Sequence, residues 1–230
     1  MELFQGAPAT LLAKIGQQSS LTLSLVKQDA CTNTRERLEF FIRERFAEHY
    51  GAHIQHFMPC LLGLDDEQGT LRAAVGVRNA AQGVLFLERY LDMPIEEAIA
   101  LRSGRSIARD EIVEVGNLGA LEAGHARLLI IAMTHFLVSQ GFRWVTFTGT
   151  LSLLNSFQRL GLSPISLGLA DPQRMGADLA DWGSYYATKP QVMVGDIWGG
   201  HTRLEAHGLY RRLGLEAFYP ALEVSDVACG

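Results

Sequence analysis

The stretch DEIVEVGNLGALEAGHARLL, residues 110–129, constrains the fold of this chain more than any other. Residues 111–118 are apolar on both faces and rich in β-branched side chains, as in a strand at the centre of a sheet. Residues 126–140 are apolar almost all round, which predicts a helix packed on that sheet and ended by Gly141. Three glycines, Gly116, Gly119 and Gly124, lie where the strand passes into the helix. The sequence therefore predicts a strand, a glycine loop and a helix in direct succession.

This junction has two interpretations. The amides of Gly124, His125 and Ala126 stand at the expected helix N-terminus, where N–H groups without helical partners and the helix dipole favour an anion such as a pyrophosphate. The alternative is an ordinary loop, because neither the GxGxxG nor the GxxxxGK[ST] pattern is present. The residues alone leave both open.

The rest of the chain predicts one α/β domain of 230 residues, with a mixed sheet whose strands are connected by helices. Further strands are expected at residues 21–26, 57–64, 71–77, 84–92, 144–150, 165–170 and 191–200. Further helices are expected at residues 35–50, 95–102, 153–160 and 202–213, with Pro94 and Ser152 at the starts of the second and third. A short N-terminal segment and a helical C-terminal tail flank the core.

Composition excludes several classes of protein. A net charge of −5 gives no basic surface for nucleic acid or an anionic membrane. The longest apolar run, residues 128–133, is far shorter than the ~20 residues that span a bilayer. The N-terminus lacks the pattern of a secretion signal, and three widely spaced cysteines suit a reducing cytoplasm. We expect no metal site, because Gly51 interrupts the helix between His49 and His53 and no HExxH motif is present.

Glu114 lies in an otherwise apolar strand, between Val113 and Val115. Burial raises the pKa of a carboxyl group toward the range useful for a general base. The alternative is a structural salt bridge to a nearby arginine, for which the candidates are Arg102, Arg105 and Arg109.

The motif WGSYY, residues 182–186, supplies a second group of candidates. Tyr185 or Tyr186 is suited to protonate a leaving thiolate as a general acid. Packing is the alternative for adjacent aromatic residues.

Three stretches together resemble the thermostable hemolysin family over residues 35–200: EIVEVGNLGALEAGHARLL, GFRWVTFTGTLSLLNSFQRLGL and WGSYYATKPQVMVGDI. That family resembles a divergent branch of the GNAT superfamily of N-acyltransferases, with affinities to acyl-homoserine-lactone and N-acyl amino acid synthases. The resemblance implies a GNAT-like mixed central sheet flanked by helices, with splayed central strands. It also implies transfer of an acyl group, long-chain acyl groups included, from acyl-CoA or acyl-ACP to an amine, and no metal.

The resemblance assigns roles to residues of the central strand. Backbone groups of Val115, Gly116, Asn117 and Leu118 are expected to bind the pantetheine arm, and an amide near Asn117 or Leu118 to stabilise the oxyanion. Glu114 corresponds to the candidate base of the autoinducer synthases.

The phosphate end of the donor maps onto the loop and the first helical turn. The family pattern falls on Leu121, Gly124 and Ala126, but Leu121 replaces the expected Arg or Gln, so acyl-ACP is as plausible a donor as acyl-CoA. His125 belongs to the same helix start. Arg127 is expected to supply a phosphate contact, and Asn155 and Phe157 to lie against the pantetheine.

The acceptor is the least defined part. Arg102, Arg105 and Arg109 are candidates for binding an acceptor carboxylate, which favours an amino acid, although solvated charges explain them equally. Trp182 is a further candidate for substrate binding. Two alternatives to an enzyme are a membrane-lytic hemolysin, for which no export signal or spanning segment is evident, and a non-catalytic module that binds acyl-CoA or acyl carrier protein.

Overall fold

The computed structural model describes residues 9–17, 20–28 and 32–219, and within them nine strands form one sheet in the order β7-β8-β6-β5-β4-β3-β2-β1-β9. The strands are β1 (Thr10–Ile15), β2 (Leu21–Lys27), β3 (Cys60–Asp65), β4 (Leu71–Asn79), β5 (Ile112–Ala120), β6 (Trp144–Gly149), β7 (Ile165–Leu169), β8 (Gln191–Asp196) and β9 (Glu216–Ala217). The α-helices are α1 (Thr32–Tyr50), α2 (Ile95–Ser103), α3 (Ala123–Ser139), α4 (Leu151–Arg159), α5 (Ile197–Ala206) and α6 (Leu209–Arg212). Short 3₁₀ helices are η1 (Ala80–Gln82), η2 (Phe86–Tyr90), η3 (Arg109–Glu111), η4 (Pro172–Trp182) and η5 (Tyr185–Thr188).

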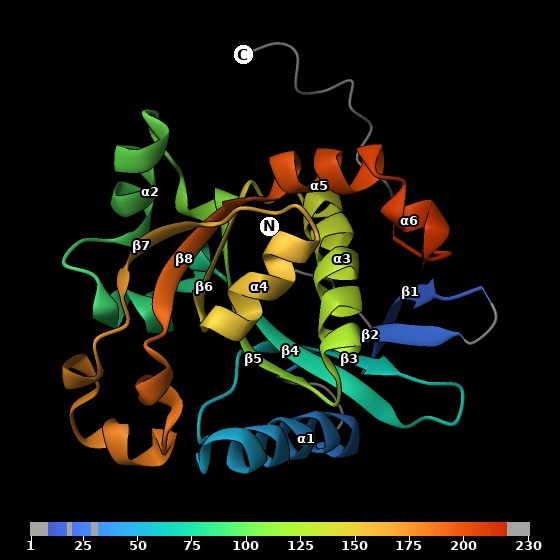
Figure 1. The fold of residues 1–230 in the computed structure, drawn as a ribbon, viewed down its shortest axis with the longest axis horizontal. Helices are drawn as coiled ribbons and strands as arrows, with labels where there is room; N and C mark the ends of the chain where they lie inside the picture. The colour runs from blue at the N-terminus through green and yellow to red at the C-terminus, as the bar shows by residue number, and fades with distance from the viewer. Residues whose placement is uncertain (1–8, 18–19, 29–31, 220–230) are drawn as a thin grey trace.

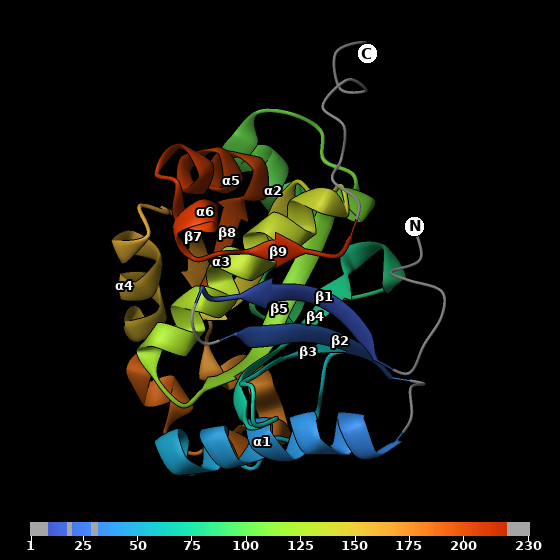
Figure 2. The same ribbon diagram turned by 90° about the vertical axis from the view of Figure 1, so that its right-hand side faces the viewer.

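Helices cover both faces of the sheet. The amphipathic helix α1 packs on one face and α3 on the other, with α4 and α5 beside α3 (Figures 1 and 2). Leu38, Ile42 and Phe46 of α1 are spaced four residues apart and are buried against the sheet. The main core lies between α3 and strands β1 to β5.

The centre of the sheet opens into a V. Strands β5 and β6 are parallel and pair only at Ile112–Trp144, Val113–Val145 and Glu114–Thr146, although both strands continue beyond these pairs. The other neighbouring pairs among the described strands are antiparallel. This arrangement confirms the expected mixed sheet with splayed central strands.

A β-bulge bends β5 at the point where it leaves β6. Asn117 and Leu118 lie opposite the single residue Val75 of β4, and Asn117 has a positive φ of 53°. A bulge of this kind changes which face of the sheet a side chain reaches. Leu118 therefore joins Val115 on the α3 face, while Asn117 is directed to the α1 face.

Several expectations about secondary structure were wrong. Residues 84–92 form no strand: Phe86–Tyr90 is the 3₁₀ helix η2, because side-chain carboxylates take the N–H groups that a strand would give to a neighbour. Strand β5 continues to Ala120 and α3 begins at Ala123, so the expected glycine loop is only two residues long. Thr150, and not Ser152, caps α4 by accepting a hydrogen bond from the Leu153 amide.

Candidate active site

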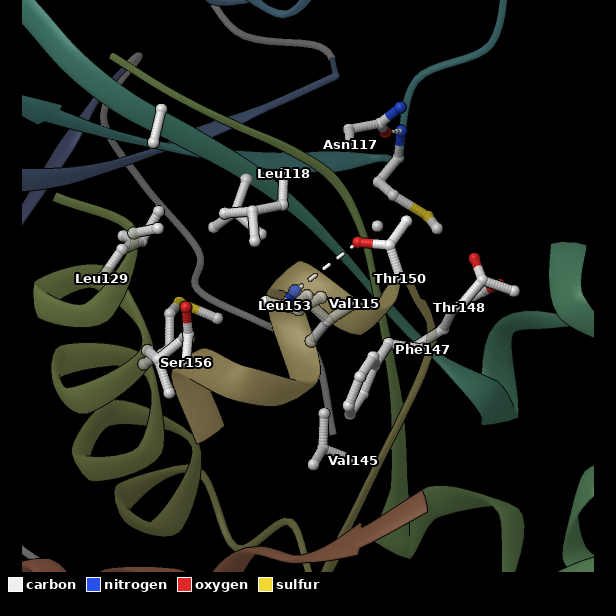
Figure 3. A pocket seen from close by; sticks show the side chains of 18 of the residues that line it. Val115, Asn117, Leu118, Leu129, Val145, Phe147, Thr148, Thr150, Leu153 and Ser156 are labelled. Carbon is white, nitrogen blue, oxygen red and sulfur yellow. Dashed lines mark hydrogen bonds between the residues drawn. The ribbon is translucent and has the colours of Figure 1, made fainter. Parts of the chain in front are cut away.

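A cavity of about 950 Å³ occupies the space between the diverging strands β5 and β6. It is lined by residues from both faces of the sheet, so it passes through the sheet where the two strands no longer pair. Figure 3 shows some of the residues from β5, β6 and α4 that line it. Residues of β5 from Val115 onward have no partner on β6, which leaves the β6 side of their backbone to face the cavity.

One half of the cavity is apolar, and we call it the apolar chamber. It lies between the sheet, α3 and α4 and is lined by Val115, Leu118, Leu129, Met133, Val145, Phe147, Leu153, Ser156 and Phe157. The rings of Phe147 and Phe157 stack with centroids 5.0 Å apart. Side chains from Ala123 to Leu137 contribute along α3, a length of about 20 Å of helix. The chamber is suited to an extended apolar chain.

The other half lies on the α1 face, and we call it the polar chamber. It is lined by Tyr50, His53, Arg78, Phe86, Arg89, Glu114, Thr148, Trp182 and Tyr185. Trp182 lies between Phe86 and Tyr185, with ring centroids 5.7 and 5.2 Å away. The two chambers differ because successive residues of a strand point to opposite faces.

Glu114 is buried in the polar chamber, with 2% of its surface exposed. Burial raises the pKa of its carboxyl group, against the opposing effects of two backbone hydrogen bonds and the Arg78 charge. The hydrogen bonds come from the amides of Leu87 at 2.9 Å and Phe86 at 3.0 Å, at the start of η2. The carboxylate is therefore held in a fixed position at the edge of the cavity.

The three arginines proposed from the sequence lie elsewhere. Arg105 pairs with Glu111 at 3.4 Å, and Arg109 pairs with Glu88 at 2.7 Å and Glu96 at 2.5 Å. Arg102 is exposed on α2. None of the three lines the cavity, and none forms an ion pair with Glu114 among the described residues. Arg78 and Arg89 are the arginines of the polar chamber.

The two candidate tyrosines have different surroundings. Tyr185 lines the cavity, its hydroxyl group is hydrogen-bonded to the Thr148 side chain, and burial raises its pKa. The Tyr186 hydroxyl lies 2.5 Å from that of Tyr90 and does not line the cavity. Of the two candidates, Tyr185 is therefore the one that faces the cavity.

The WGSYY motif has its own structural reason. Gly183 has a φ of 50°, and a Cβ atom there would lie 2.1 Å from the Tyr50 carbonyl oxygen. The Ser184 amide donates a hydrogen bond to the same carbonyl at 2.8 Å. A glycine is required for this close approach, which brings Trp182 and Tyr185 to the end of α1.

The expected donor-binding residues divide into two groups. Val115, Gly116, Asn117, Leu118, Ala126 and Phe157 line the cavity, whereas Gly124, His125, Arg127 and Asn155 do not. Asn155 is exposed, since α4 turns Ser152, Leu153 and Ser156 to the cavity instead. At the start of α3, Glu122 makes no side-chain cap, and Leu121, Glu122 and Ala123 line the mouth of the apolar chamber. The assignment of these residues to a donor stays a prediction.

Asn117 holds the wall of the polar chamber in place. Its side-chain oxygen accepts a hydrogen bond from the Met58 amide at 2.9 Å, and its Nδ2 donates to the His56 carbonyl at 3.2 Å. Met58 packs so closely that a Cβ atom on Gly76 or Gly116 would lie within 2.6 or 2.7 Å of it. Gly116 is thus explained by the packing of Met58 as well as by its place in the cavity.

A mixed sheet with a splayed parallel pair and a helix starting at its mouth is a GNAT-like fold. Solved structures with this fold include FeeM, an N-acyl amino acid synthase from uncultured soil microbes, with a TM-score of 0.56, 13% identity and coverage of 84% of this chain and 98% of that one. The AHL synthase LasI matches with a TM-score of 0.53, 9% identity and coverage of 78% and 91%. The CoA-dependent acyl-homoserine lactone synthase BjaI, solved with SAM and isopentyl-CoA, matches with a TM-score of 0.52, 15% identity and coverage of 88% and 90%.

The chain belongs to the thermostable hemolysin family, whose model matches residues 28–201. No protein of curated function matches the sequence. Among the described residues, no helix has the length and apolar character needed to cross a membrane. The described residues also contain no group of three or more His, Cys, Asp or Glu side chains that could hold a metal ion.

Proposed function

We propose that this protein is an N-acyltransferase that moves an acyl group from acyl-CoA or acyl-ACP to the amine of a small acceptor. The observation that carries the proposal is the cavity between β5 and β6, which joins an apolar chamber to a polar chamber that contains a buried carboxylate. An acyltransferase has to bring an apolar thioester and a polar amine together at one point. The splayed strands supply such a point.

The donor fits the α3 side. The backbone of Val115 to Leu118 faces the cavity without a β6 partner and is suited to hydrogen-bond a pantetheine arm. The amides at the start of α3, which Glu122 does not cap with its side chain, suit the phosphate end. The apolar chamber then holds the acyl chain, and its extent along α3 favours a long chain because each buried methylene contributes about 0.8 kcal/mol.

The reaction is a direct displacement. Glu114 takes a proton from the acceptor ammonium, and the free amine attacks the thioester carbonyl carbon. The new C–N bond forms and the C–S bond breaks, while an amide of the bulge at Asn117 or Leu118 stabilises the oxyanion. Tyr185 donates its proton to the leaving thiolate and regains one from the acylated nitrogen, while Glu114 releases the proton that it took from the ammonium to solvent. The products are an N-acyl compound and a free thiol.

The proposal is tested by amine-dependent thiol release, measured with a thiol-reactive chromophore across acyl-CoA and acyl-ACP donors and a panel of amines. The variant Glu114→Gln should lower turnover about 100-fold or more, since general bases contribute roughly 10² to 10⁴. Mass spectrometry of the same reactions identifies the N-acyl product and so names the donor and the acceptor.

Glu88→Gln is the matched control. Glu88 also accepts two backbone hydrogen bonds, from Leu85 at 2.7 Å and Ile95 at 2.8 Å, but it does not line the cavity. This variant should keep wild-type turnover. Donor binding without amine-dependent thiol release from any donor would favour a non-catalytic binding module. Lysis of erythrocytes by purified protein without an acyl donor would favour a lytic hemolysin. A cytoplasmic location stays a prediction and rests on the cysteine pattern alone.

A further inference from the structure

Arg78 is an arginine of the polar chamber that the proposed reaction does not use. It lies on β4 directly opposite Glu114 on β5, in the antiparallel register of the two strands. Directly opposite residues of an antiparallel pair project from the same face, with Cβ atoms about 5 Å apart. Both side chains line the cavity. A positive and a negative group therefore stand side by side on one wall.

The Arg78 and Glu114 side chains both form hydrogen bonds to the segment of residues 84–87. The Glu114 carboxylate accepts the amides of Phe86 and Leu87, and an Arg78 guanidinium nitrogen lies 3.3 Å from the Val84 carbonyl oxygen, to which it donates. The charge of Arg78 acts on Glu114, whose pKa it lowers against the larger effect of burial. The guanidinium and the carboxylate are therefore close enough for one small molecule to contact both.

Arg78 also differs from its neighbour Arg89. Arg89 pairs with Asp178 at 3.3 Å and lies 4.0 Å above the Phe86 ring, so its charge is already matched. Arg78 is half-buried and forms no salt bridge within the described part of the chain. A half-buried guanidinium with a single contact to a carbonyl retains N–H groups for a carboxylate, which matches its planar fork.

We propose that Arg78 binds the carboxylate of the acceptor, and that the acceptor is an α-amino acid whose amine is directed at Glu114. This inference rests on the proposed function and names the substrate class of the same site. An α-amino acid separates its ammonium and carboxylate groups by one carbon, which suits two charged side chains on adjacent strands. A simple amine contacts only Glu114 and leaves Arg78 without a carboxylate partner.

The test compares amino acids with their decarboxylated amines as acceptors: leucine with 3-methylbutylamine, and phenylalanine with phenethylamine. Wild-type protein should prefer each amino acid by at least ~30-fold in kcat/KM, because a charged hydrogen-bonded pair is lost with the amine. Arg78→Gln should remove most of this preference by raising KM for the amino acid. An effect of the lost charge on the pKa of Glu114 falls on both acceptor types and leaves their ratio unchanged. Arg78→Lys should restore part of it, since it keeps the charge without the fork.

Arg72→Gln is the matched control, because Arg72 lies on the same strand, pairs with Asp66 and does not line the cavity. It should keep the wild-type preference. Wild-type protein that acylates the amines as well as the amino acids would overturn the inference and leave the proposed function intact. Arg78→Gln activity that falls equally for both acceptor types would also overturn it, since that is the pattern of an effect on Glu114 alone. No amine-dependent thiol release with either set would instead reject the proposed function.

Discussion

The two chambers of the cavity share the same two strands and have opposite chemistry. Val115 and Phe147 face the apolar chamber, whereas Glu114 and Thr148 face the polar chamber. The alternation of the strands VEV and TFT is sufficient to separate them, and the bulge at Asn117 keeps the separation where β5 bends. The comparison shows how one pair of strands can offer an apolar surface for an acyl chain on one face of the sheet and a polar surface for an amine on the other.

The chambers also differ in what builds their walls. The apolar chamber is formed by the long helix α3 and by α4, which pack on the sheet. The polar chamber is closed by two connecting segments, 51–58 and 178–185, that are joined by a hydrogen bond from the His53 amide to the Asp181 carbonyl at 2.6 Å. Connecting segments change more readily than packed helices. We therefore expect acceptor preference to be more easily altered than acyl preference.

The largest further effect on turnover should come from a substitution in the polar chamber. Tyr185→Phe removes the hydroxyl group proposed to protonate the thiolate and should lower kcat about 100-fold, with KM for both substrates little changed. Steady-state kinetics with one donor and one amine measure this effect. Tyr186→Phe in the same assay decides between the two adjacent tyrosines that the sequence could not distinguish.

Tyr90→Phe controls for the loss of a buried hydroxyl group near the site. The Tyr90 hydroxyl is hydrogen-bonded to Tyr186 and does not line the cavity, so this variant should keep its kcat. If Tyr185→Phe and Tyr90→Phe lower kcat equally, Tyr185 acts through packing and not as an acid.

A smaller effect is expected in the apolar chamber. Ser156 has 9% of its surface exposed, lines the chamber and donates its hydroxyl back to the Ser152 carbonyl at 3.4 Å. Ser156→Phe should exclude about three methylenes of a long acyl chain, which at about 0.8 kcal/mol each lowers kcat/KM roughly 60-fold for long donors. Short donors should be unaffected. A series of acyl-CoA chain lengths measures the shift.

Gln158→Phe adds the same ring to the exposed face of α4, outside the chamber. Its chain-length profile should match that of wild type. An unchanged chain-length profile in Ser156→Phe would mean that the acyl chain lies elsewhere. The apolar chamber would then not be the acyl-binding half of the cavity.

The sequence predicted the central strand, its buried glutamate and the helix that follows, because strand alternation and helix periodicity are local patterns. It assigned pantetheine binding to the backbone of Val115 to Leu118 only through the family resemblance, since the divergence of β5 from β6 depends on two strands that are far apart in the sequence. The prediction of a strand at residues 84–92 was wrong for a similar reason. The amides of this segment bind the carboxylates of Glu88 and Glu114, and no local pattern shows that partnership.

Arg78 shows most clearly what the sequence could not give. Its position opposite Glu114 depends on the register of β4 against β5, and that register shifts at the bulge. A slip of one residue would turn the arginine to the other face. The sequence instead indicated Arg102, Arg105 and Arg109, which precede the strand in the chain but lie outside the cavity.

The smallest expected effect is a difference in how Glu114 and Glu88 couple the free energy of unfolding to pH. Burial raises the pKa of Glu114 in the folded protein, so the protonated form is favoured by folding. Its contribution to stability is full below the ordinary glutamate pKa of about 4.5 and is lost as pH rises through the raised folded value. Burial also acts to raise the pKa of Glu88, but hydrogen bonds from Arg109, Ile95 and Leu85 outweigh it and hold the pKa below its ordinary value. Glu88 therefore contributes stability above about 4.5 that is lost as pH falls.

Urea denaturation between pH 3 and pH 8 tests whether Glu114 and Glu88 change the stability in opposite directions as pH rises. Relative to wild type, Glu114→Gln should become more stable as pH rises above about 4.5, because it lacks the cost of a buried charge. Glu88→Gln should become less stable than wild type as pH rises toward and above about 4.5, because it lacks the paired charge of Glu88. Parallel curves for wild type and Glu114→Gln would mean that hydrogen bonds from Phe86 and Leu87 fully offset burial. Glu114 would then be an ordinary carboxylate at neutral pH, and its role as the base would depend on position alone.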